Sequence, residues 1–272
     1  MAEKIWFITG ASRGLGRVWT EAALARGDKV AACVRSKATL ADLLETHGSA
    51  LLPIELDVRG EADVRDAVRL AAATFGRLDV VVANAGYAVF AAIEETDHDN
   101  ARAQFDTNFF GTLWVIQAVL PVLRTQGGGR ILITSSLAGI ITFPTAGIYN
   151  ASKWAVEGLG ETLASEVADF GIKVTLIEPG GYDTDWRGSS STHLASMPDY
   201  AGLRDRLKAA SSSRKLGNPA ATAEAILRVV DAASPPLRLF LGEAGLGIAQ
   251  KQYAERLATW DAWADVSRRA QG

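Results

Sequence analysis

The stretch from Lys4 to Gly16 reads KIWFITGASRGLG and decides how the rest of the chain is interpreted. Its start, Lys4 to Thr9, is apolar on both faces, which is typical of a strand covered on both sides. The glycines that follow permit a tight turn and let backbone amides approach a pyrophosphate at the start of a helix, predicted from Arg17 to Arg26. The residues expected to bind a dinucleotide here are Gly10, Ser12, Arg13, Gly14, Leu15 and Gly16.

Similar apolar runs recur along the chain, at residues 29–34, 51–56, 78–83, 130–134, 173–177 and 237–241. Segments between them, such as Glu61 to Phe75, carry apolar residues at helical spacing. Strands that alternate with helices predict one α/β domain over residues 1–272, built on a doubly wound parallel sheet.

Two segments depart from this alternation. Residues 180–219 follow the sixth strand without a clear period, and so long an irregular connection is typical of a substrate lid. Residues 243–272 form a predicted helical extension. Its apolar residues at helical spacing indicate a helix packed on the domain, with an interface as the alternative: Ile248, Tyr253, Leu257, Trp260 and Trp263.

Composition excludes several classes of function. The chain has 272 residues, 48% of them hydrophobic and 22% charged, and a net charge of -3 without a basic run, so nucleic-acid binding is not expected. No apolar run reaches the ~20 residues that span a bilayer, and the first strand leaves no room for a signal peptide, so a cytoplasmic location is expected. The single cysteine, Cys33, lies in an apolar segment and is predicted to be buried. The histidines His47, His98 and His193 lack ligand spacing, so no metal is implied.

The glycine-rich loop also has a competing interpretation. Gly10 to Gly14 matches the Gly-x-Ser-x-Gly elbow of α/β-hydrolases, with Ser12 as the nucleophile. An elbow after the first strand leaves no upstream loop for the second oxyanion donor, and His193 falls in the predicted lid. A Ser12 hydrolase is therefore the weaker alternative.

The choice of nicotinamide cofactor follows from charge at the end of the second strand. NAD-preferring sites place an acid there to bind the ribose hydroxyls. Val34 stands at this position, Arg35 follows it, and Arg13 in the loop is a second cation. Two guanidiniums suit a 2'-phosphate, which favours NADP(H) over NAD(H). The alternative is that both arginines are solvated surface residues.

The candidate acid/base residue lies in the segment Tyr149-Asn150-Ala151-Ser152-Lys153. On a helix, Tyr149 and Lys153 lie on one face. An ammonium ion about 4 Å from a phenol, at an effective dielectric near 20, is worth about 4 kcal/mol, or roughly three pKa units. The pair therefore predicts an acid/base with a lowered pKa. Ser136 comes just after the strand at 130–134, where ligands bind in open parallel sheets.

In their order along the chain, from about Lys4 to Phe240, these motifs resemble the short-chain dehydrogenase/reductase family, whose fold is the Rossmann fold. The resemblance implies that Ser136 hydrogen-bonds the substrate oxygen and that Tyr149 exchanges a proton as hydride moves to or from the nicotinamide. It implies that Lys153 acidifies the phenol and holds the ribose. Asn108 resembles the family's helix asparagine, which holds a water linking Lys153 to solvent; a capping or kinking amide is the alternative.

Further cofactor contacts are implied by the same resemblance. Asp57 and Val58 resemble the adenine contact. Asn84, Ala85 and Gly86 resemble the family's Asn-Asn-Ala-Gly segment, with Ala83 in place of the first Asn. The segment that in the family bonds the carboxamide is matched by Pro179, Gly180, Gly181, Tyr182, Asp183 and Thr184.

The substrate pocket is expected where the family's pocket lies. Its residues would be Val89, Phe90, Leu137, Phe143, Ile148, Tyr182 and Trp186. Their apolar character favours a hydrophobic ketone or secondary alcohol. A carrier-bound 3-oxoacyl substrate stays open because the predicted lid also carries Arg187, Arg204, Arg206, Lys208, Arg214 and Lys215. A non-catalytic NADP(H)-sensing protein is the remaining alternative. The resemblance implies a homodimer or homotetramer, assembled through helices at 108–123 and 149–170.

Overall fold

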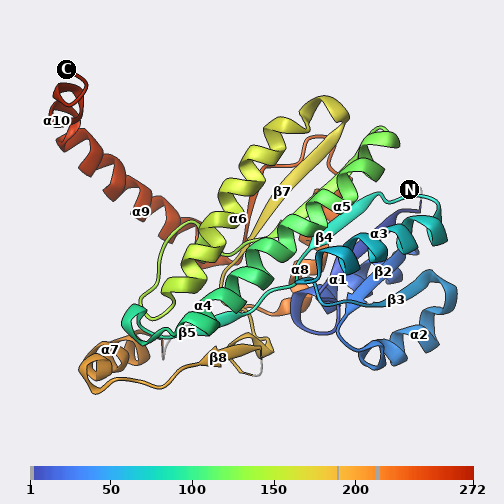
Figure 1. Ribbon diagram of the computed structural model, residues 1–272, viewed down its shortest axis with the longest axis horizontal. Coiled ribbons are helices and arrows are strands. Elements are labelled where there is room, and N and C mark those ends of the chain that lie inside the picture. Colours follow the sequence, from blue (N-terminus) through green and yellow to red (C-terminus); the bar gives the residue numbers. More distant parts are fainter. Residues whose placement is uncertain (1–2, 189, 212–214) are drawn as a thin grey trace.

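The computed structural model describes residues 3–188, 190–211 and 215–272 (Figure 1). Within these residues a seven-stranded parallel sheet has the order β3-β2-β1-β4-β6-β7-β9. Its strands are β1 (Ile5–Thr9), β2 (Lys29–Val34), β3 (Leu51–Glu55), β4 (Val80–Ala83), β6 (Gly129–Thr134), β7 (Ile172–Pro179) and β9 (Arg238–Leu241). The predicted doubly wound α/β sheet is confirmed. The strand order reverses beside β1, so a crevice opens between the carboxyl ends of β1 and β4.

Helices cover both faces of the sheet. One face carries α1 (Gly14–Ala25), α2 (Ala41–His47) and α8 (Thr222–Asp231), and the other carries α3 (Glu61–Phe75), α5 (Gly111–Thr125) and α6 (Gly147–Glu166). Because successive side chains of a strand point to opposite faces, β1 contributes to two cores. Trp6 and Ile8 pack with α1 and α8, whereas Ile5 and Phe7 pack with α3, α5 and α6. This explains why the strands are apolar on both faces.

Cys33 lies in the core beneath α3 and α5, as predicted from its apolar segment. Burial raises the pKa of its thiol. The side chain therefore acts as a small hydrophobic residue.

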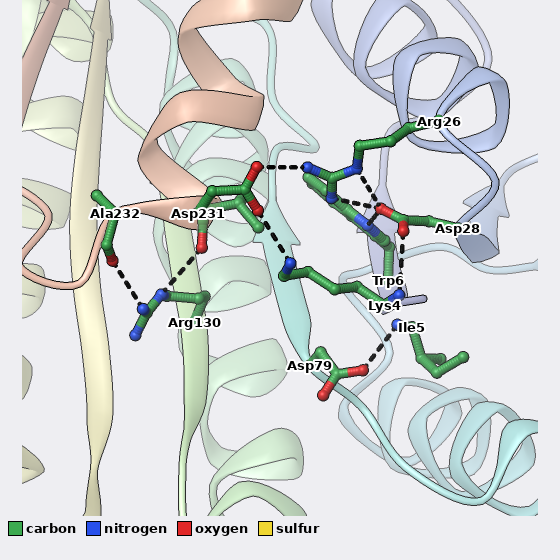
Figure 2. Close-up of polar contacts among 10 residues, drawn as sticks. Lys4, Ile5, Trp6, Arg26, Asp28, Asp79, Arg130, Asp231 and Ala232 are labelled. Carbon is green, nitrogen blue, oxygen red and sulfur yellow. Dashed lines mark hydrogen bonds and ion pairs between the residues drawn. The ribbon is translucent and has the colours of Figure 1, made fainter. Parts of the chain in front are cut away.

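A polar network ties the helices to the sheet at the amino-terminal end of β1 (Figure 2). The nearly buried Asp28 accepts hydrogen bonds from the indole Nε1 of Trp6 at 2.7 Å and from the backbone N of Lys4 at 3.0 Å. Arg26 pairs with Asp28 and also with Asp231 at the end of α8, and Lys4 Nζ lies 2.9 Å from the same Asp231. Charge-assisted hydrogen bonds connect the helices and strands at this end of the sheet, and the crevice lies at the opposite end.

The segment at 180–219 is more regular than the sequence predicts. It contains β8 (Ser191–His193) and α7 (Ala201–Ser211), and β8 pairs in parallel with β5 (Ala88–Phe90) to form a second, two-stranded sheet. β8 has 3 residues, and the large apolar residues of α7 are Leu203 and Leu207 alone, so neither element shows a hydrophobic period long enough to recognise. Arg214, one of the predicted lid cations, lies outside the described residues.

The segment is also fastened to the domain. Glu95 accepts a hydrogen bond from the backbone N of Met197 at 2.7 Å and forms an ion pair with Arg204 on α7. Tyr200 donates to Glu94 at 2.7 Å.

The C-terminal helices correct a second prediction. Only the first turns of α9 (Glu243–Ala262) pack on the domain, through Gly245, Ile248 and Ala249. The remainder of α9 and α10 (Ala264–Arg269) projects from the body (Figure 1). We call residues 250–269 the C-terminal arm. Arg256 in the arm still contacts the domain, at Trp154 and at the carbonyl oxygen of Ile140. The prediction of a packed helix is wrong for the rest of the arm, because Leu257, Trp260 and Trp263 are exposed. None of the helices in the described ranges is long and apolar enough to cross a membrane.

Candidate active site

A cleft of ≈ 1990 Å³ opens at the carboxyl ends of the sheet. Pockets for small ligands usually have about 300–1,000 Å³, so this cleft has room for a dinucleotide together with a substrate. The structure brings together most of the residues predicted to bind the cofactor. Those lining the cleft are Gly10, Ser12, Arg13, Gly14, Leu15, Arg35, Asp57, Val58, Asn84, Ala85, Gly86, Tyr149, Lys153, Pro179, Gly180, Tyr182 and Thr184.

The glycine-rich loop fits a pyrophosphate. Gly10 and Gly14 have φ angles of +67° and +57°, a region that favours glycine. No side chain caps the amino end of α1, which leaves the first amides of the helix to an anion. Gly16, in contrast, lies behind the loop and does not line the cleft. A Cβ there would stand 2.3 Å from the carbonyl oxygen of Gly10, so Gly16 allows α1 to approach the loop.

Asn84 holds the floor of the cleft together. Its Nδ2 donates to the carbonyl oxygens of Thr9 at 3.1 Å and Gly10 at 3.2 Å, and its Oδ1 accepts from Thr134 Oγ1 at 3.1 Å. Thr9 Oγ1 in turn accepts from the backbone N of Asn84 at 3.0 Å. The sequence indicates Asn84 but not Thr9 or Thr134. Together these side chains fix the ends of β1, β4 and β6 relative to one another.

Charges at the far end of the cleft favour a phosphate. Arg35 is exposed directly after β2, and Arg13 lines the same cleft. Asp57 lies nearby, and its pKa is held below the usual range mainly by hydrogen bonds from Arg59, with a smaller contribution from Arg35. Arg59, which the sequence analysis missed, thus offsets the charge of Asp57.

The predicted catalytic residues converge at the inner end of the cleft. Ser136 accepts a hydrogen bond from the backbone N of Ala138 at 3.0 Å, and its side chain and that of Tyr149 line the same cleft. Lys153 Nζ donates to the carbonyl oxygen of Thr134 at 2.7 Å and lies 6.0 Å from the ring centre of Tyr149. Because α6 presents Tyr149 and Lys153 on one face, both reach the ends of β4 and β6.

The charges of the protein do not lower the pKa of Tyr149, contrary to the prediction from the sequence. Burial raises the pKa of the Tyr149 phenol, and the neighbouring Ser136 hydroxyl only partly opposes this. Burial also lowers the pKa of Lys153 to about 8, against the attraction of Glu157. The Lys153 ammonium donates its hydrogen bond to Thr134. Removal of the Tyr149 phenol from water therefore raises its pKa by more than the ammonium lowers it.

Asn108 lies behind Lys153. It belongs to a π-helical turn, Asp106–Phe110, at the start of α5, and it is fully buried. Its Nδ2 donates to the carbonyl oxygen of Tyr87 at 3.0 Å and to Ser152 Oγ at 3.1 Å, and its Oδ1 accepts from Tyr87 N at 3.1 Å. A Cβ on Gly86 would lie 3.1 Å from Asn108 Oδ1 and 3.6 Å from Lys153 Nζ. Asn108 therefore does not line the cleft but supports the segment beside Lys153.

Aromatic rings surround Tyr149. Trp186 lies 5.2 Å from the Tyr149 ring, centre to centre, and Phe90 and Phe143 pack in the same cluster. Of the predicted pocket residues, those that line the cleft are Phe90, Leu137, Phe143, Tyr182 and Trp186. Val89 and Ile148 do not, because each neighbours a lining residue along its strand or helix and therefore points elsewhere. Among the cations of the predicted lid, Arg204, Lys208 and Lys215 line the cleft, whereas Arg206 does not.

His193, the partner that a Ser12 hydrolase would require, is engaged on β8. Its ring hydrogen-bonds with Ser191 Oγ at 3.0 Å and stacks on Phe90 with the centres 5.1 Å apart. This contact gives no support to the hydrolase alternative.

Two buried carboxyl groups behind Lys153 were not found from the sequence. Glu157 and Glu178 share one cation, since Arg238 Nε lies 2.9 Å from Glu157 Oε2 and 3.6 Å from Glu178 Oε1. Burial, together with the charge of Glu157, raises the pKa of Glu178 to about 8, so this group carries a proton at neutral pH. The available signals were an acid four residues after Lys153 and a lone acid within the apolar strand β7.

Glu178→Gln is expected to remove part of the loss of stability at alkaline pH. A carboxyl group whose pKa is raised by folding contributes stability below its unfolded pKa of about 4.3, and this contribution is lost as the pH rises through about 8. The variant cannot ionise, so its melting temperature should exceed that of the wild type by several degrees at pH 9, at about 2–4 °C per kcal/mol, and by little at pH 5. Calorimetry over this range measures the gap, with Glu161→Gln on the same arginine as the control. Parallel curves for wild type and Glu178→Gln would contradict the assignment.

Comparison with known proteins identifies the family. The short chain dehydrogenase family model matches residues 4–195. Oxidoreductase BOA17 of Botryotinia fuckeliana is 42% identical over 97% of this chain and 98% of its own length. The 3-ketodihydrosphingosine reductase of Bacteroides thetaiotaomicron is 34% identical over 89% of each chain. A crystal structure of a short-chain dehydrogenase from Streptomyces avermitilis superposes with a TM-score of 0.91 at 35% identity, covering 98% of both chains.

Other solved structures of this fold were determined with NADP or with NAD. The fold that holds the glycine-rich loop, the cleft and the Ser136–Tyr149–Lys153 group is shared with the structure from Streptomyces avermitilis. The chain belongs to the short-chain dehydrogenase/reductase family and is an oxidoreductase of that family.

Proposed function

We propose that the protein transfers a hydride between NADP(H) and a hydrophobic ketone or secondary alcohol, with Tyr149 as the acid/base. The observation that carries this proposal is that Ser136, Tyr149 and Lys153 line one cleft with the glycine-rich loop, beside a cluster of aromatic rings that packs on Tyr149.

The side chains can complete a carbonyl reduction. A nicotinamide cofactor held in the cleft by the glycine-rich loop would supply the hydride that the carbonyl carbon takes up. Ser136 donates a hydrogen bond to the carbonyl oxygen, and Tyr149 delivers its phenolic proton to that oxygen as the C=O bond becomes CH–OH. Lys153 stabilises the phenolate left behind, and Tyr149 recovers a proton before the next turnover. The same steps in reverse oxidise the alcohol.

The walls of the pocket support a hydrophobic substrate. Phe90, Phe143 and Trp186 surround Tyr149, and Leu137 lines the same space. A relative named as a 3-ketodihydrosphingosine reductase acts on a ketone, which agrees with this class. A carrier-bound 3-oxoacyl substrate is the second candidate, favoured by Lys208 and Lys215 at the cleft. It is ranked second because the ion pair with Glu95 offsets the charge of Arg204.

A panel of substrates tests the proposal. Oxidation of NADPH is followed at 340 nm with aromatic ketones, long-chain ketones and 3-oxoacyl thioesters, and each is repeated with NADH. We expect turnover with the hydrophobic ketones. Faster turnover of 3-oxoacyl thioesters would select the second candidate. Tight NADPH binding without turnover of any compound would instead indicate a sensing protein, and ester hydrolysis lost in Ser12→Ala would indicate a hydrolase.

Arg35→Ala tests the cofactor preference. Loss of a hydrogen bond to a charged group costs about 1.5–3 kcal/mol, so the KM for NADPH is expected to rise roughly 10- to 150-fold. The KM for NADH should hardly change, because NADH lacks the 2'-phosphate. Lys37→Ala, which removes an exposed cation two positions later that does not line the cleft, is the matched control. Equal increases for both cofactors would rule out a phosphate contact at Arg35.

A further inference from the structure

Glu157 is a buried acid beside Lys153 to which the steps above give no role. It is 5% exposed and follows Lys153 by four residues on α6, a spacing that puts both side chains on the buried face of the helix. Its Oε1 is shielded from solvent and has no hydrogen-bond partner among the described residues. A carboxylate in such surroundings is costly unless nearby positive charges offset the loss of water.

The turn that follows Ser136 packs against α6 between these two residues. A Cβ on Gly139 would lie 2.9 Å from Cγ of Glu157 and 3.1 Å from the carbonyl oxygen of Lys153, so glycine at this position allows the close approach. Gly139 is itself buried, as are Lys153 and Glu157. Water is thus kept away from both charges, and they attract each other more strongly than a pair on the surface would.

In the described part of the chain, the ionisable groups that face Glu157 come from three elements. Lys153 and Glu161 lie on α6, one turn to either side of it, Glu178 lies on β7 and Arg238 lies on β9. Arg238 Nε is 2.9 Å from Glu157 Oε2, and Arg238 Nη2 is 2.7 Å from Glu161 Oε2. Glu178 carries a proton at neutral pH, so Arg238 and Lys153 are left to offset the charge of Glu157.

We propose that Glu157 is a positioning residue of the reaction inferred above: its carboxylate keeps the Lys153 ammonium charged in the buried space behind Tyr149, and Arg238 keeps Glu157 itself ionised. This inference rests on the proposed function, because Glu157 acts through the charge that Lys153 presents to the phenolate of Tyr149. Burial lowers the pKa of Lys153 to about 8, and the charge of Glu157 limits this fall. Without that charge the ammonium would be lost at a lower pH.

Glu157→Gln tests the proposal through the pH dependence of kcat for ketone reduction. An opposite charge about 6 Å away, at an effective dielectric near 20, is worth about two pKa units, so the decline expected near pH 8 should move down by about one to two pH units. Glu157→Asp keeps the charge and should restore the wild-type inflection. Glu161→Gln removes the other acid that pairs with Arg238 and, as the matched control, should leave the inflection in place.

Glu178 also titrates near pH 8, so its own variant shows which group the inflection reports. Glu178→Gln should keep the inflection, and its loss in this variant would overturn the role of Glu157 in turnover. If Glu157→Gln does not fold, Glu157→Gln/Arg238→Gln removes both partners of the ion pair together. Its inflection should also move down, because Glu157, rather than Arg238, is the charge that raises the pKa of Lys153.

Labelling with acetic anhydride separates this inference from the proposed function. The Lys153 amine reacts only without its extra proton, so acetylation against pH, read by mass spectrometry of the peptide, reports its pKa without turnover. The midpoint should lie near pH 8 in the wild type and about one to two units lower in Glu157→Gln. An unshifted midpoint, or an equal shift in Glu161→Gln, would overturn the proposal even in an enzyme that reduces ketones. A shifted midpoint in a protein without ketone turnover would keep the link between Glu157 and Lys153 and overturn the proposed function alone.

Discussion

Replacing Tyr149 with phenylalanine is expected to lower kcat by about 10²- to 10⁴-fold, the usual contribution of a positioned acid/base. The ring that packs on Trp186 stays in place, whereas the proton donor is lost. NADPH binding, measured by fluorescence titration, should stay within about twofold because the glycine-rich loop and Lys153 are untouched. Tyr200→Phe removes a hydroxyl that bonds Glu94 at the edge of the 180–219 segment and serves as the control.

The size of the loss distinguishes the proposed role from a purely structural one. A structural role of the phenol would appear as a lower melting temperature with kcat preserved. A Tyr149→Phe enzyme that turns over ketones at the wild-type rate would mean that another group supplies the proton, and the assignment would be abandoned.

Lys153→Met is the second substitution with a large expected effect. Methionine keeps the length of the side chain but removes the ammonium, so we expect kcat to fall by at least about 10²-fold. The pKa of Lys153 is lowered to about 8, which means that the ammonium is present below that pH and lost above it. The wild-type kcat for ketone reduction should therefore decline as the pH rises through about 8. The variant should lack that inflection.

Measurement of kcat from pH 6 to 10 separates the two enzymes. Lys173→Met, on an exposed position of β7, controls for the substitution itself. Melting curves report whether loss of the bond to Thr134 unfolds the protein. A variant that keeps both the wild-type rate and the inflection near pH 8 would remove Lys153 from the mechanism.

The parts of this protein that depend on local rules could be predicted from the sequence. The spacing of Tyr149 and Lys153 fixes their common helix face wherever the helix lies, and the position of Ser136 after a buried strand fixes the end of the sheet that it reaches. Apolar runs likewise placed the strands to within a few residues, because both faces of the sheet are buried.

What could not be predicted depends on neighbours that are distant in sequence. The bonds of Asn84 to Thr9 and Thr134 exist only because β1, β4 and β6 are adjacent in the sheet. Whether the Tyr149 pKa rises or falls depends on burial, which residue spacing does not report. β5 and β8 are three-residue strands about a hundred positions apart, and strands this short show no hydrophobic period from which their pairing could be predicted. For the same reason the sequence does not indicate that Val89 and Phe90 point to opposite sides of β5.

The Asp28 network lies at the amino-terminal ends of the strands, away from the cleft, which bears on the directed evolution of this enzyme. The Asp28 network and the cleft lie at opposite ends of the same strands, so they use different side chains. Phe90, Phe143 and Trp186 can be varied without disturbing the bonds among Trp6, Asp28 and Asp231. Substitutions that alter the shape of the cleft therefore leave the anchoring network at the other end of the sheet intact.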